Sequence, residues 1–255
     1  MSTLFDLSGK RALVTGSAGG LGDAIARAFA DAGAELLLSD ATDSCVAQAK
    51  RLAAEGMRAE AVVADLARPE EVKGLVARAL EGESISILVC NAGVLGPIGP
   101  LSEVPREAVE LLFQVNLYSV LAISSAIMPG IAKSGGGSVI LMSSIAGLRG
   151  NRSIGAYGIS KAALAQIARN LAVEWGPYNV RVNAISPGLI RTPFAKGILE
   201  DQVYLERRLS LTPLRRPGEP EEIAGAALFL ASPAGGFVTG HNLIVDGGTV
   251  ISDGN

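Results

Sequence analysis

Residues 10–22 read Lys-Arg-Ala-Leu-Val-Thr-Gly-Ser-Ala-Gly-Gly-Leu-Gly, and this stretch is the strongest indication of the fold class. Its first part, 10–15, is a short apolar run that ends at a glycine, which predicts a buried strand. An amphipathic pattern then continues to Ala32, with Gly33 as a helix stop signal. A strand that turns through glycines into a helix lets bare backbone approach an anionic group at the helix N-terminus. The stretch therefore predicts the opening strand, turn and helix of an α/β sheet with a phosphate-binding turn.

The same alternation of strand and helix continues along the chain. Further strands are expected at 35–39, 59–64, 85–90, 138–142, 180–185 and 243–245, and further helices at about 43–55, from 69, and at 105–132, 154–175 and 220–230. The segment 191–216 is polar and rich in proline, which indicates a loop with short helices. With no break in composition, the pattern predicts one domain, 1–255. Its expected architecture is a three-layer, doubly wound, Rossmann-type α/β fold around a mostly parallel seven-stranded sheet.

Composition limits the classes of protein that this chain can represent. Hydrophobic residues make up 49% and charged residues 18% of the 255, which excludes a disordered chain. A net charge of −3 with only 4% aromatic residues argues against a nucleic-acid partner, which needs a basic face or stacking platforms. One histidine, His241, and two distant cysteines, Cys45 and Cys90, suit neither a metal site nor a disulfide framework. We expect no metal, and reduced cysteines in a cytoplasmic protein.

One stretch, 111–132, carries no charged side chain and has about the length of a membrane-spanning helix. It includes polar residues such as Gln114 and Asn116, and also Pro129, so we interpret it as a helix buried on most sides. Residues 1–9 lack the basic-then-apolar order of a signal peptide. The sequence therefore predicts no membrane partner.

Several polar or small residues stand where predicted strands end. They are Gly16, Asp40, Asp65, Asn91, Ser144 and Pro187. Ligands of such sheets bind beyond the carboxyl ends of the strands. We therefore expect these residues to converge on one binding site.

Asp40 is the residue that bears on the choice of cofactor. It closes the second predicted strand, 18 residues after Gly22. A carboxylate there accepts hydrogen bonds from adenosine ribose hydroxyls and repels a 2′-phosphate. Ser17 and Ala41 occupy the nearest places for a cation, and neither is basic. This pattern favours NAD over NADP, although a helix-capping or turn aspartate is the alternative.

Tyr157 and Lys161 stand four residues apart in the helix predicted over 154–175. Residues i and i+4 share one helix face, so the phenol and the ammonium can enter the same cleft. A nearby cation is expected to lower the pKa of the tyrosine from about 10, which suits it for proton transfer. By itself the pair is also compatible with a solvated tyrosine and a surface lysine.

Five motifs in order give a specific resemblance. Thr15-Gly16-x-x-x-Gly20-x-Gly22, Asn91-Ala92-Gly93, Ser144, Tyr157-x-x-x-Lys161 and Pro187-Gly188-x-x-x-Thr192 resemble the single-domain branch of the short-chain dehydrogenase/reductase family from about 10 to 248. The resemblance, with the strand-end pattern, implies an NAD site formed by Gly16, Ser17, Gly20, Leu21, Gly22, Asp40, Asp65, Leu66, Asn91, Ala92, Gly93, Tyr157, Lys161, Pro187, Gly188, Ile190 and Thr192. Asp65 with Leu66 would contact the adenine edge; an Asx turn is the alternative for Asp65.

The family's catalytic roles follow from the same resemblance. Tyr157 would be the acid/base, and Ser144, 13 residues before it, would orient the substrate oxygen. Lys161 would bind the nicotinamide ribose. Asn116 would hold a water that links Lys161 to solvent, and a polar side chain within a charge-free helix needs a partner in any case. Thr192 and the Pro187-Gly188 turn would hold the nicotinamide carboxamide.

Residues expected to face the substrate are mostly apolar. They are Leu95, Ile98, Ser144, Ile145, Leu148, Arg149, Asn151, Tyr157, Leu189, Phe194 and Ile198. They suggest a medium-sized, hydrophobic alcohol or ketone, and 189–216 is expected to form a substrate loop that closes on binding. Arg149, Arg152, Arg191 and Lys196 could recognise a carboxylate or remain solvated loop charges.

Three functions remain open. The first is an NAD-dependent oxidoreductase that interconverts a secondary alcohol and a ketone. The second is a 3-oxoacyl-thioester (acyl-carrier-protein) reductase, which would use NADPH and need a basic face; Asp40 and the net charge of −3 disfavour it. The third is a dinucleotide-sensing regulator, disfavoured because Ser144, Tyr157 and Lys161 are all present. Charge-free and small-residue helix faces, together with the resemblance, imply a homotetramer.

Overall fold

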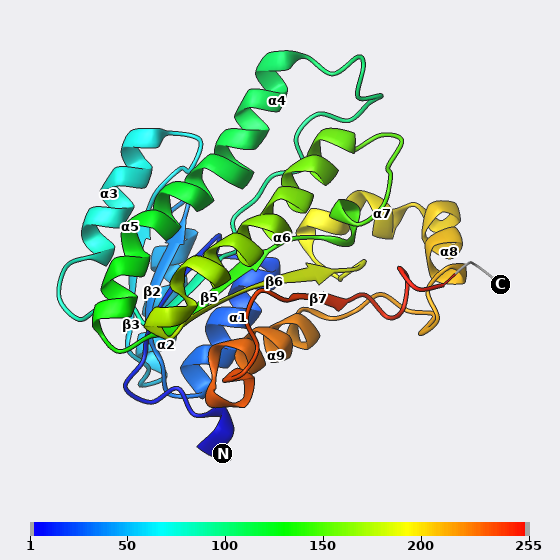
Figure 1. The fold of residues 1–255 in the computed structure, drawn as a ribbon. Helices are drawn as coiled ribbons and strands as arrows, with labels where there is room; N and C mark the ends of the chain where they lie inside the picture. Colours follow the sequence, from blue (N-terminus) through cyan, green and yellow to red (C-terminus); the bar gives the residue numbers. More distant parts are fainter. Residues whose placement is uncertain (1–2, 253–255) are drawn as a thin grey trace.

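The computed structural model describes residues 3–252 and confirms the predicted α/β fold. Seven parallel strands form one sheet in the order β3-β2-β1-β4-β5-β6-β7 (Figure 1). Their bounds are β1 Arg11–Thr15, β2 Glu35–Asp40, β3 Ala59–Val63, β4 Ile87–Cys90, β5 Gly137–Met142, β6 Val180–Pro187 and β7 Asn242–Val245. The order reverses beside β1, between β1 and β4, which places a crevice at the carboxyl ends of these central strands.

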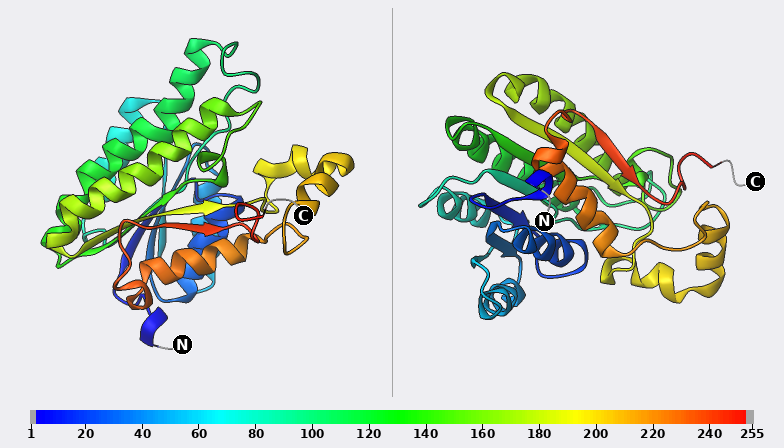
Figure 2. Two further views of the ribbon diagram at one scale, coloured as in Figure 1. Left: turned by 45° about the vertical axis from the view of Figure 1, so that its right-hand side comes forward. Right: turned by 90° about the horizontal axis from the view of Figure 1, so that it is seen from below.

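Helices cover both faces of the sheet (Figures 1 and 2). One face carries α1 Gly20–Asp31, α2 Ser44–Ala54 and α9 Pro220–Ala231. The other carries α3 Pro69–Ala79, α4 Arg106–Phe113, α5 Ser119–Lys133 and α6 Gly155–Trp175. Two short helices, α7 Lys196–Glu200 and α8 Gln202–Ser210, stand apart from these layers beyond the strand ends, in the segment predicted to be a loop with short helices.

The β1 strand shows why the sheet must be covered on both sides. Leu13 packs into the core beneath α3, α5 and α6, whereas its neighbours Ala12 and Val14 pack into the core beneath α1, α2 and α9. All three side chains are fully buried. Burying one such leucine or valine stabilises the fold by about 1.5–3 kcal/mol. The near-continuous apolar runs of the central strands follow from this two-sided burial.

The long helix predicted over 105–132 is continuous but not uniform. Between α4 and α5 the chain forms one π-helical turn, Gln114–Tyr118. The run Arg106–Lys133 is long and apolar enough to cross a membrane, yet half of its apolar window is buried inside the protein. Its inward side chains, such as Ile123 and Ile127, belong to the core. The interpretation as a core helix therefore agrees with the packing.

The bounds of all seven strands agree with the prediction to within two residues. Strand β6 was expected to end at Ile185 but continues to Pro187, because it pairs with β7 up to Pro187 opposite Val245. Strand β3 ends at Val63, one residue early, at the exposed edge of the sheet.

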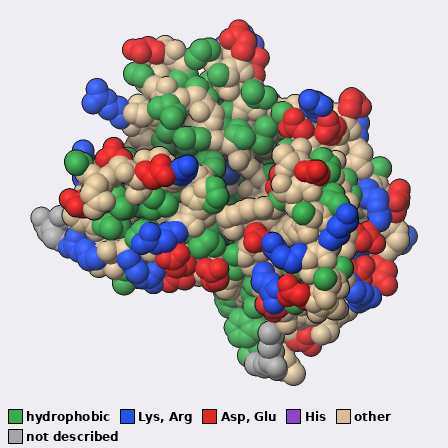
Figure 3. Space-filling view, turned by 180° about the vertical axis from the view of Figure 1, so that it is seen from behind, with side chains coloured by type: hydrophobic (Ala, Val, Ile, Leu, Met, Phe, Trp, Pro, Cys, Tyr) green, Lys and Arg blue, Asp and Glu red, His purple; other side chains and the backbone are tan. Residues whose placement is uncertain are grey.

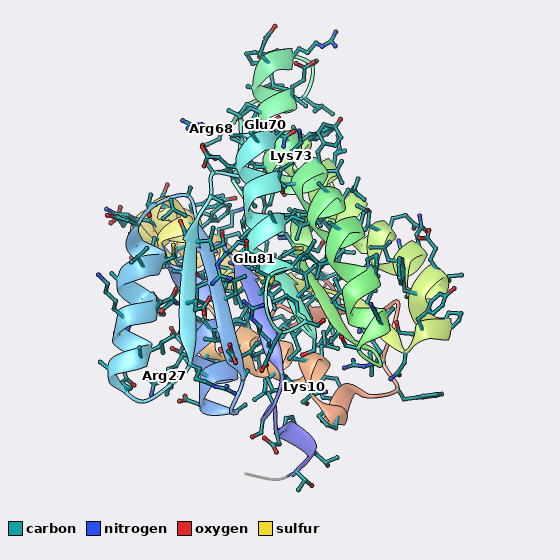
Figure 4. All side chains as sticks on the ribbon, turned by 90° about the vertical axis from the view of Figure 1, so that its left-hand side faces the viewer. Lys10, Arg27, Arg68, Glu70, Lys73 and Glu81 are labelled. Atoms are coloured by element: carbon teal, nitrogen blue, oxygen red, sulfur yellow. The ribbon has the colours of Figure 1, made fainter. Side chains whose placement is uncertain are left out.

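Charged side chains lie mainly on the outside and alternate in sign. The face in Figure 3 mixes basic and acidic side chains without a large region of one sign. On α3, Lys73 and Glu70 lie side by side at the outer surface, with their charged groups 3.0 Å apart (Figure 4). Such exposed pairs contribute little to stability, and ion pairs of the described residues neutralise half of the 22 Lys and Arg side chains of the chain.

Candidate active site

A cleft of about 930 Å³ opens at the carboxyl ends of the central strands, within the roughly 300–1,000 Å³ typical of small-molecule sites. Most of the residues predicted from sequence line it. They are Gly16, Gly20, Leu21, Asp40, Asp65, Leu66, Asn91, Ala92, Gly93, Leu95, Ile98, Ser144, Ile145, Arg149, Asn151, Tyr157, Lys161, Pro187, Gly188, Leu189, Ile190, Thr192, Phe194 and Ile198. Four predicted residues, Ser17, Gly22, Asn116 and Leu148, are not among the lining residues.

The glycine turn has the close packing that a bound phosphate group requires. Gly16 has φ +61°, and a side chain there would come within 2.7 Å of the Ala92 Cα. A side chain on Gly22 would come within 1.9 Å of the Gly16 carbonyl oxygen. Both glycines therefore keep the turn closed against the sheet and leave the first turn of α1 bare, an arrangement suited to an anion. Gly22 supports the turn from behind and does not itself face the cleft.

Ser17 corrects one prediction. Its side chain is fully buried and its Oγ is without a hydrogen-bond partner among the described residues. The reason lies in the backbone: the Ser17 N–H donates to the Ser39 carbonyl (3.0 Å), and its own carbonyl accepts from Gln48 Nε2 (2.9 Å). These bonds turn the residue toward α2 and away from the cleft.

Asn91 fastens the ends of β1 and β4 together. Its Nδ2 donates to the carbonyl oxygens of Thr15 (3.1 Å) and Gly16 (2.7 Å). The backbone N–H groups of Asn91 and Ala92 donate to Thr15 Oγ1 at 3.1 and 3.2 Å. Buried polar groups are thus paired between the two strands, and the floor of the cleft is rigid.

One end of the cleft is acidic. Asp40 accepts a hydrogen bond at Oδ2 from the Ala18 N–H (3.1 Å), and Asp65 also lines this end. Asp65 Oδ1 accepts from the Ala67 N–H (2.9 Å), which is the Asx turn considered as the alternative for this residue. Among residues 3–252, the Lys and Arg side chains that line the cleft come from segments that lie later in the chain than Asp40 and Asp65. Arg149 lies in the loop after β5, Lys161 in α6 and Arg208 in α8.

Tyr157 and Lys161 lie on one face of α6, as the spacing predicted, and both are almost fully buried. Lys161 Nζ is 5.6 Å from the centre of the Tyr157 ring and donates to the Met142 carbonyl oxygen at 2.8 Å. Ser144 lines the cleft and forms a hydrogen bond with Tyr157. The neighbouring Ser143 hydroxyl instead donates to the Lys161 carbonyl oxygen (2.7 Å). The structure thus brings Ser144, Tyr157 and Lys161 together.

The pKa values of this pair differ from the expectation. We expected Lys161 to lower the pKa of Tyr157, but burial raises it to about 12, and the hydrogen bond with Ser144 only partly opposes this. Burial also lowers the pKa of Lys161 to about 8. The ammonium donates to Met142 rather than to the phenol, so it does not offset the loss of water around Tyr157. Without other charges in the cleft, Tyr157 is a neutral phenol at neutral pH.

Asn116 lies in the π-helical turn and is fully buried behind the cleft. Its Oδ1 accepts from the Val94 N–H (2.8 Å), and its Nδ2 donates to the Val94 carbonyl (2.9 Å) and to Ser160 Oγ (3.2 Å). Both N–H groups of the side chain are therefore engaged, and they hold the loop after β4 against α6. The water relay remains a prediction for this residue.

The wall opposite α6 comes from the segment after β6. Phe194 places its ring centre 6.0 Å from that of Tyr157. Thr192 packs closely on the glycine turn, since a side chain on Gly20 would come within 3.2 Å of it. Leu148 is 41% exposed and is not among the residues that line the cleft, which corrects its place among the substrate residues.

Sequence reasoning missed some lining residues. Val94, Met142, Ile154 and Arg208 also border the cleft. Met142 and Val94 adjoin predicted strand ends or motifs and could have been included on that basis. Arg208 lies in α8, where no motif or periodic pattern sets it apart from its neighbour Arg207.

Comparison with known proteins places the chain in a family. The family model described as "Enoyl-(Acyl carrier protein) reductase" matches residues 16–250. Dehydrogenase/reductase SDR family member 4 of Oryctolagus cuniculus is 38% identical over 244 residues, covering 95% of this chain and 94% of the relative. The chain belongs to the short-chain dehydrogenase/reductase family. The predicted resemblance is confirmed, and this short-chain dehydrogenase/reductase is an oxidoreductase.

Solved structures of the family share the whole fold. A gluconate 5-dehydrogenase from Burkholderia cenocepacia J2315, in complex with NADP and tartrate, has a TM-score of 0.93 at 32% identity and covers 98% of both chains. A 7α-hydroxysteroid dehydrogenase, complexed with NADH and 7-oxo glycochenodeoxycholic acid, has a TM-score of 0.91 at 35% identity and covers 97% of both chains. A nicotinamide cofactor is thus common to these relatives, in either its NADP or its NAD form.

Proposed function

We propose that this protein is an NAD-dependent oxidoreductase that interconverts a secondary alcohol and a ketone. The observation that carries the proposal is the meeting of Ser144, Tyr157 and Lys161 in one cleft that ends at a closed glycine turn. We treat 1–255 as one domain, with 189–216 as its substrate loop. The family and the geometry together support this reaction, and the residue roles below are part of the proposal.

The cleft fits a dinucleotide. The glycine turn and the N-terminus of α1 would hold the pyrophosphate, and Asp40 would accept hydrogen bonds from the adenosine ribose. Lys161 has N–H donors beyond the one given to Met142, and these would reach the second ribose. The segment from Pro187 to Thr192 would hold the carboxamide. When bound, NAD supplies the acceptor for the hydride and the positive charge of its nicotinamide ring.

On the protein's side, the chemistry is proton transfer and charge stabilisation. Ser144 donates a hydrogen bond to the substrate oxygen and so fixes it beside the Tyr157 hydroxyl. In the oxidation direction the Tyr157 phenolate accepts the hydroxyl proton as the carbonyl forms. In the reduction direction the neutral phenol, which its raised pKa favours, donates that proton back to the oxygen.

Asp40 supports NAD over NADP. Its carboxylate lines the acidic end of the cleft, where Asp65 is its charged neighbour. A 2′-phosphate would meet this carboxylate, and the described residues between 15 and 66 that line this end of the cleft include no cation to offset it. The test is a fluorescence titration of the purified protein with NADH and NADPH. We expect roughly 10- to 100-fold tighter binding of NADH, and a smaller difference in Asp40→Ala.

The control for that titration is Asp43→Ala, which changes a nearby carboxylate that does not line the cleft. It should leave the preference unchanged. Tighter binding of NADPH by the unaltered protein would remove the argument for NAD. The second candidate, a 3-oxoacyl-thioester (acyl-carrier-protein) reductase that uses NADPH, would then move to first place.

The oligomeric state and the cellular location of the protein are also proposals. Large apolar side chains remain exposed on α4, the π-helical turn, α5 and α6, including Leu111, Tyr118, Leu121, Ile159 and Val173. We propose a homotetramer that buries these helices, and a monomer mass in light scattering at micromolar concentration would contradict it. We also propose a cytoplasmic location, which cell fractionation would test.

A further inference from the structure

Two arginines face the substrate end of the cleft from different segments. Arg149 follows the short 3-10 turn Ile145–Gly147, which comes directly after Ser144. Arg208 lies on α8, 59 residues further along the chain. Both line the same cleft as Ser144, Tyr157 and Phe194. The fold therefore gathers two guanidinium groups close to the site proposed for the reaction.

Neither guanidinium makes a hydrogen bond or an ion pair within the described residues 3–252. Half of the 22 Lys and Arg side chains lie within 4.0 Å of a carboxylate in this part of the chain, as Lys73 does of Glu70 (Figure 4). The other three cations considered from sequence either form an ion pair or lie outside the cleft. Arg191 pairs with Glu219 (2.9 Å) and Lys196 with Glu200 (3.8 Å), while Arg152 is exposed and does not line the cleft.

Arg149 lies within electrostatic range of Arg208. The pKa of Arg149 is lowered, first by burial and then by the positive charge of Arg208, while Asp246 and Tyr204 act in the opposite direction. The two oxygens of Asp246 already accept backbone N–H groups, from Gly248 (2.8 Å) and Val250 (2.7 Å). Two like charges held near one another in a partly buried site are unfavourable unless an anion lies between them.

Side-chain hydrogen bonds are made to the backbone carbonyl groups of both arginines. Asn151 Nδ2 donates to the carbonyl oxygens of Arg149 (3.0 Å) and Ala146 (3.1 Å), which holds the loop against the start of α6. Thr212 Oγ1 donates to the Arg208 carbonyl (3.0 Å) at the end of α8. The loop that carries Arg149 is therefore held against α6, whereas Arg208 lies on the segment 189–216 that is proposed to close over the site.

We propose that Arg149 and Arg208 form a carboxylate-binding subsite, and that the substrate is a secondary alcohol or ketone that bears a carboxylate. This inference rests on the proposed function. Two arginines and Asp246 leave one net positive charge, which a single carboxylate matches better than a doubly charged phosphate. Each guanidinium offers paired N–H donors of the geometry that a carboxylate accepts. Leu95, Ile98 and Phe194 line the cleft and would contact the body of the substrate.

The test is calorimetric titration of the full-length protein, saturated with NADH, with two matched pairs of probes. One pair is D-gluconate and the neutral polyol D-glucitol; the other is cholate and its neutral methyl ester. Within at least one pair we expect the anion to bind roughly 10- to 100-fold more tightly. Arg149→Gln and Arg208→Gln should each abolish most of that difference and leave the affinity of the neutral partner within about twofold. Arg208→Lys should restore part of it.

Matched controls lie close by in the chain. Arg152→Gln and Arg207→Gln each remove an exposed arginine that does not line the cleft, and both should keep the preference for the anion. Equal binding of the anion and its neutral partner in both pairs would overturn the subsite, as would an equal loss of preference in the control variants. Failure of the proposed function is seen separately, as a loss of NADH binding or of NAD-dependent turnover in the unaltered protein.

Discussion

The two walls of the cleft are built in opposite ways. The wall on α6 carries Tyr157 and Lys161, which are 8% and 3% exposed and are backed by the core of the sheet. The wall formed by α7 and α8 carries Arg208, and no residue of either helix is buried. Reacting groups need fixed geometry, which close packing supplies. Recognition of a particular substrate needs only a surface that can change without loss of the core, so specificity can vary on α8 while the chemistry is kept on α6.

Replacing Tyr157 tests the rigid wall most directly. Tyr157→Phe removes only the hydroxyl and keeps the packing of the ring beside Phe194. We expect turnover to fall by roughly 10²- to 10⁴-fold because the acid/base is lost, while NADH affinity is kept. Steady-state kinetics and NADH titration measure both quantities. Tyr178→Phe, at an exposed tyrosine far from the cleft-lining residues, is the control; activity of Tyr157→Phe within tenfold of the unaltered enzyme would contradict the role.

The glycine turn should be almost as sensitive. Gly22→Ala places a methyl group within 1.9 Å of the Gly16 carbonyl oxygen, so the turn must move. We expect a loss of about 2 kcal/mol or more in the free energy of unfolding and weaker NADH binding. Urea denaturation measures the first effect.

The matched control is Gly74→Ala within α3, where a side chain meets nothing within 4 Å. It should stabilise the protein by about 0.5–1 kcal/mol because alanine is the better helix former. Equal stability changes at the two glycines would show that the close approach of the turn is not structurally important.

The pH dependence reports the burial of Tyr157. Its pKa is raised to about 12, so below that value the phenolate fraction grows as pH rises. The kcat/KM for alcohol oxidation should therefore increase by up to about tenfold per pH unit from pH 7, and flatten as Lys161, with a pKa of about 8, loses its charge. The kcat/KM for ketone reduction, which uses the neutral phenol, should not rise. An oxidation profile without slope between pH 7 and 9 would exclude this assignment.

The smallest expected effect is on protease cleavage of the wall formed by α7 and α8, which belongs to the segment 189–216. If 189–216 closes over the site, NAD with a substrate should slow trypsin cleavage after Lys196 and Arg207 by a few fold. Mass spectrometry of the fragments can follow these sites beside Lys133, at the end of α5, as an internal reference. Equal cleavage rates with and without ligand would mean that the segment does not act as a lid.

Local patterns were sufficient for most of the first wall. The glycines of the turn, the i,i+4 spacing of Tyr157 and Lys161, and the polar residues after each strand each express a backbone rule that acts within a few residues. The parallel sheet then brings them together, since its carboxyl ends meet at one edge. For the same reason Asp40 could be placed in the cleft from its position at the carboxyl end of β2 alone.

The burial of individual side chains, and their contacts with segments distant in sequence, could not be predicted from such local patterns. The inward turn of Ser17, the outward position of Leu148 and the raised pKa of Tyr157 depend on which atoms of distant segments surround each side chain. The hydrogen-bond partners of Asn116 in the π-helical turn, Val94 and Ser160, likewise lie 22 and 44 residues away.

From the sequence alone we could predict the alternation of strands and helices, the parallel sheet and the family, because these follow from periodicity and from motifs whose spacing is local. The tertiary structure alone decided which charges are left without a partner. Arg149 was one of four cations considered from sequence and Arg208 was not considered, whereas in the fold both line one cleft and neither has an ion-pair partner among the described residues. The physical reason is that the Coulomb interaction between two charged groups depends on their distance in space, which in a folded chain is not set by their separation in sequence.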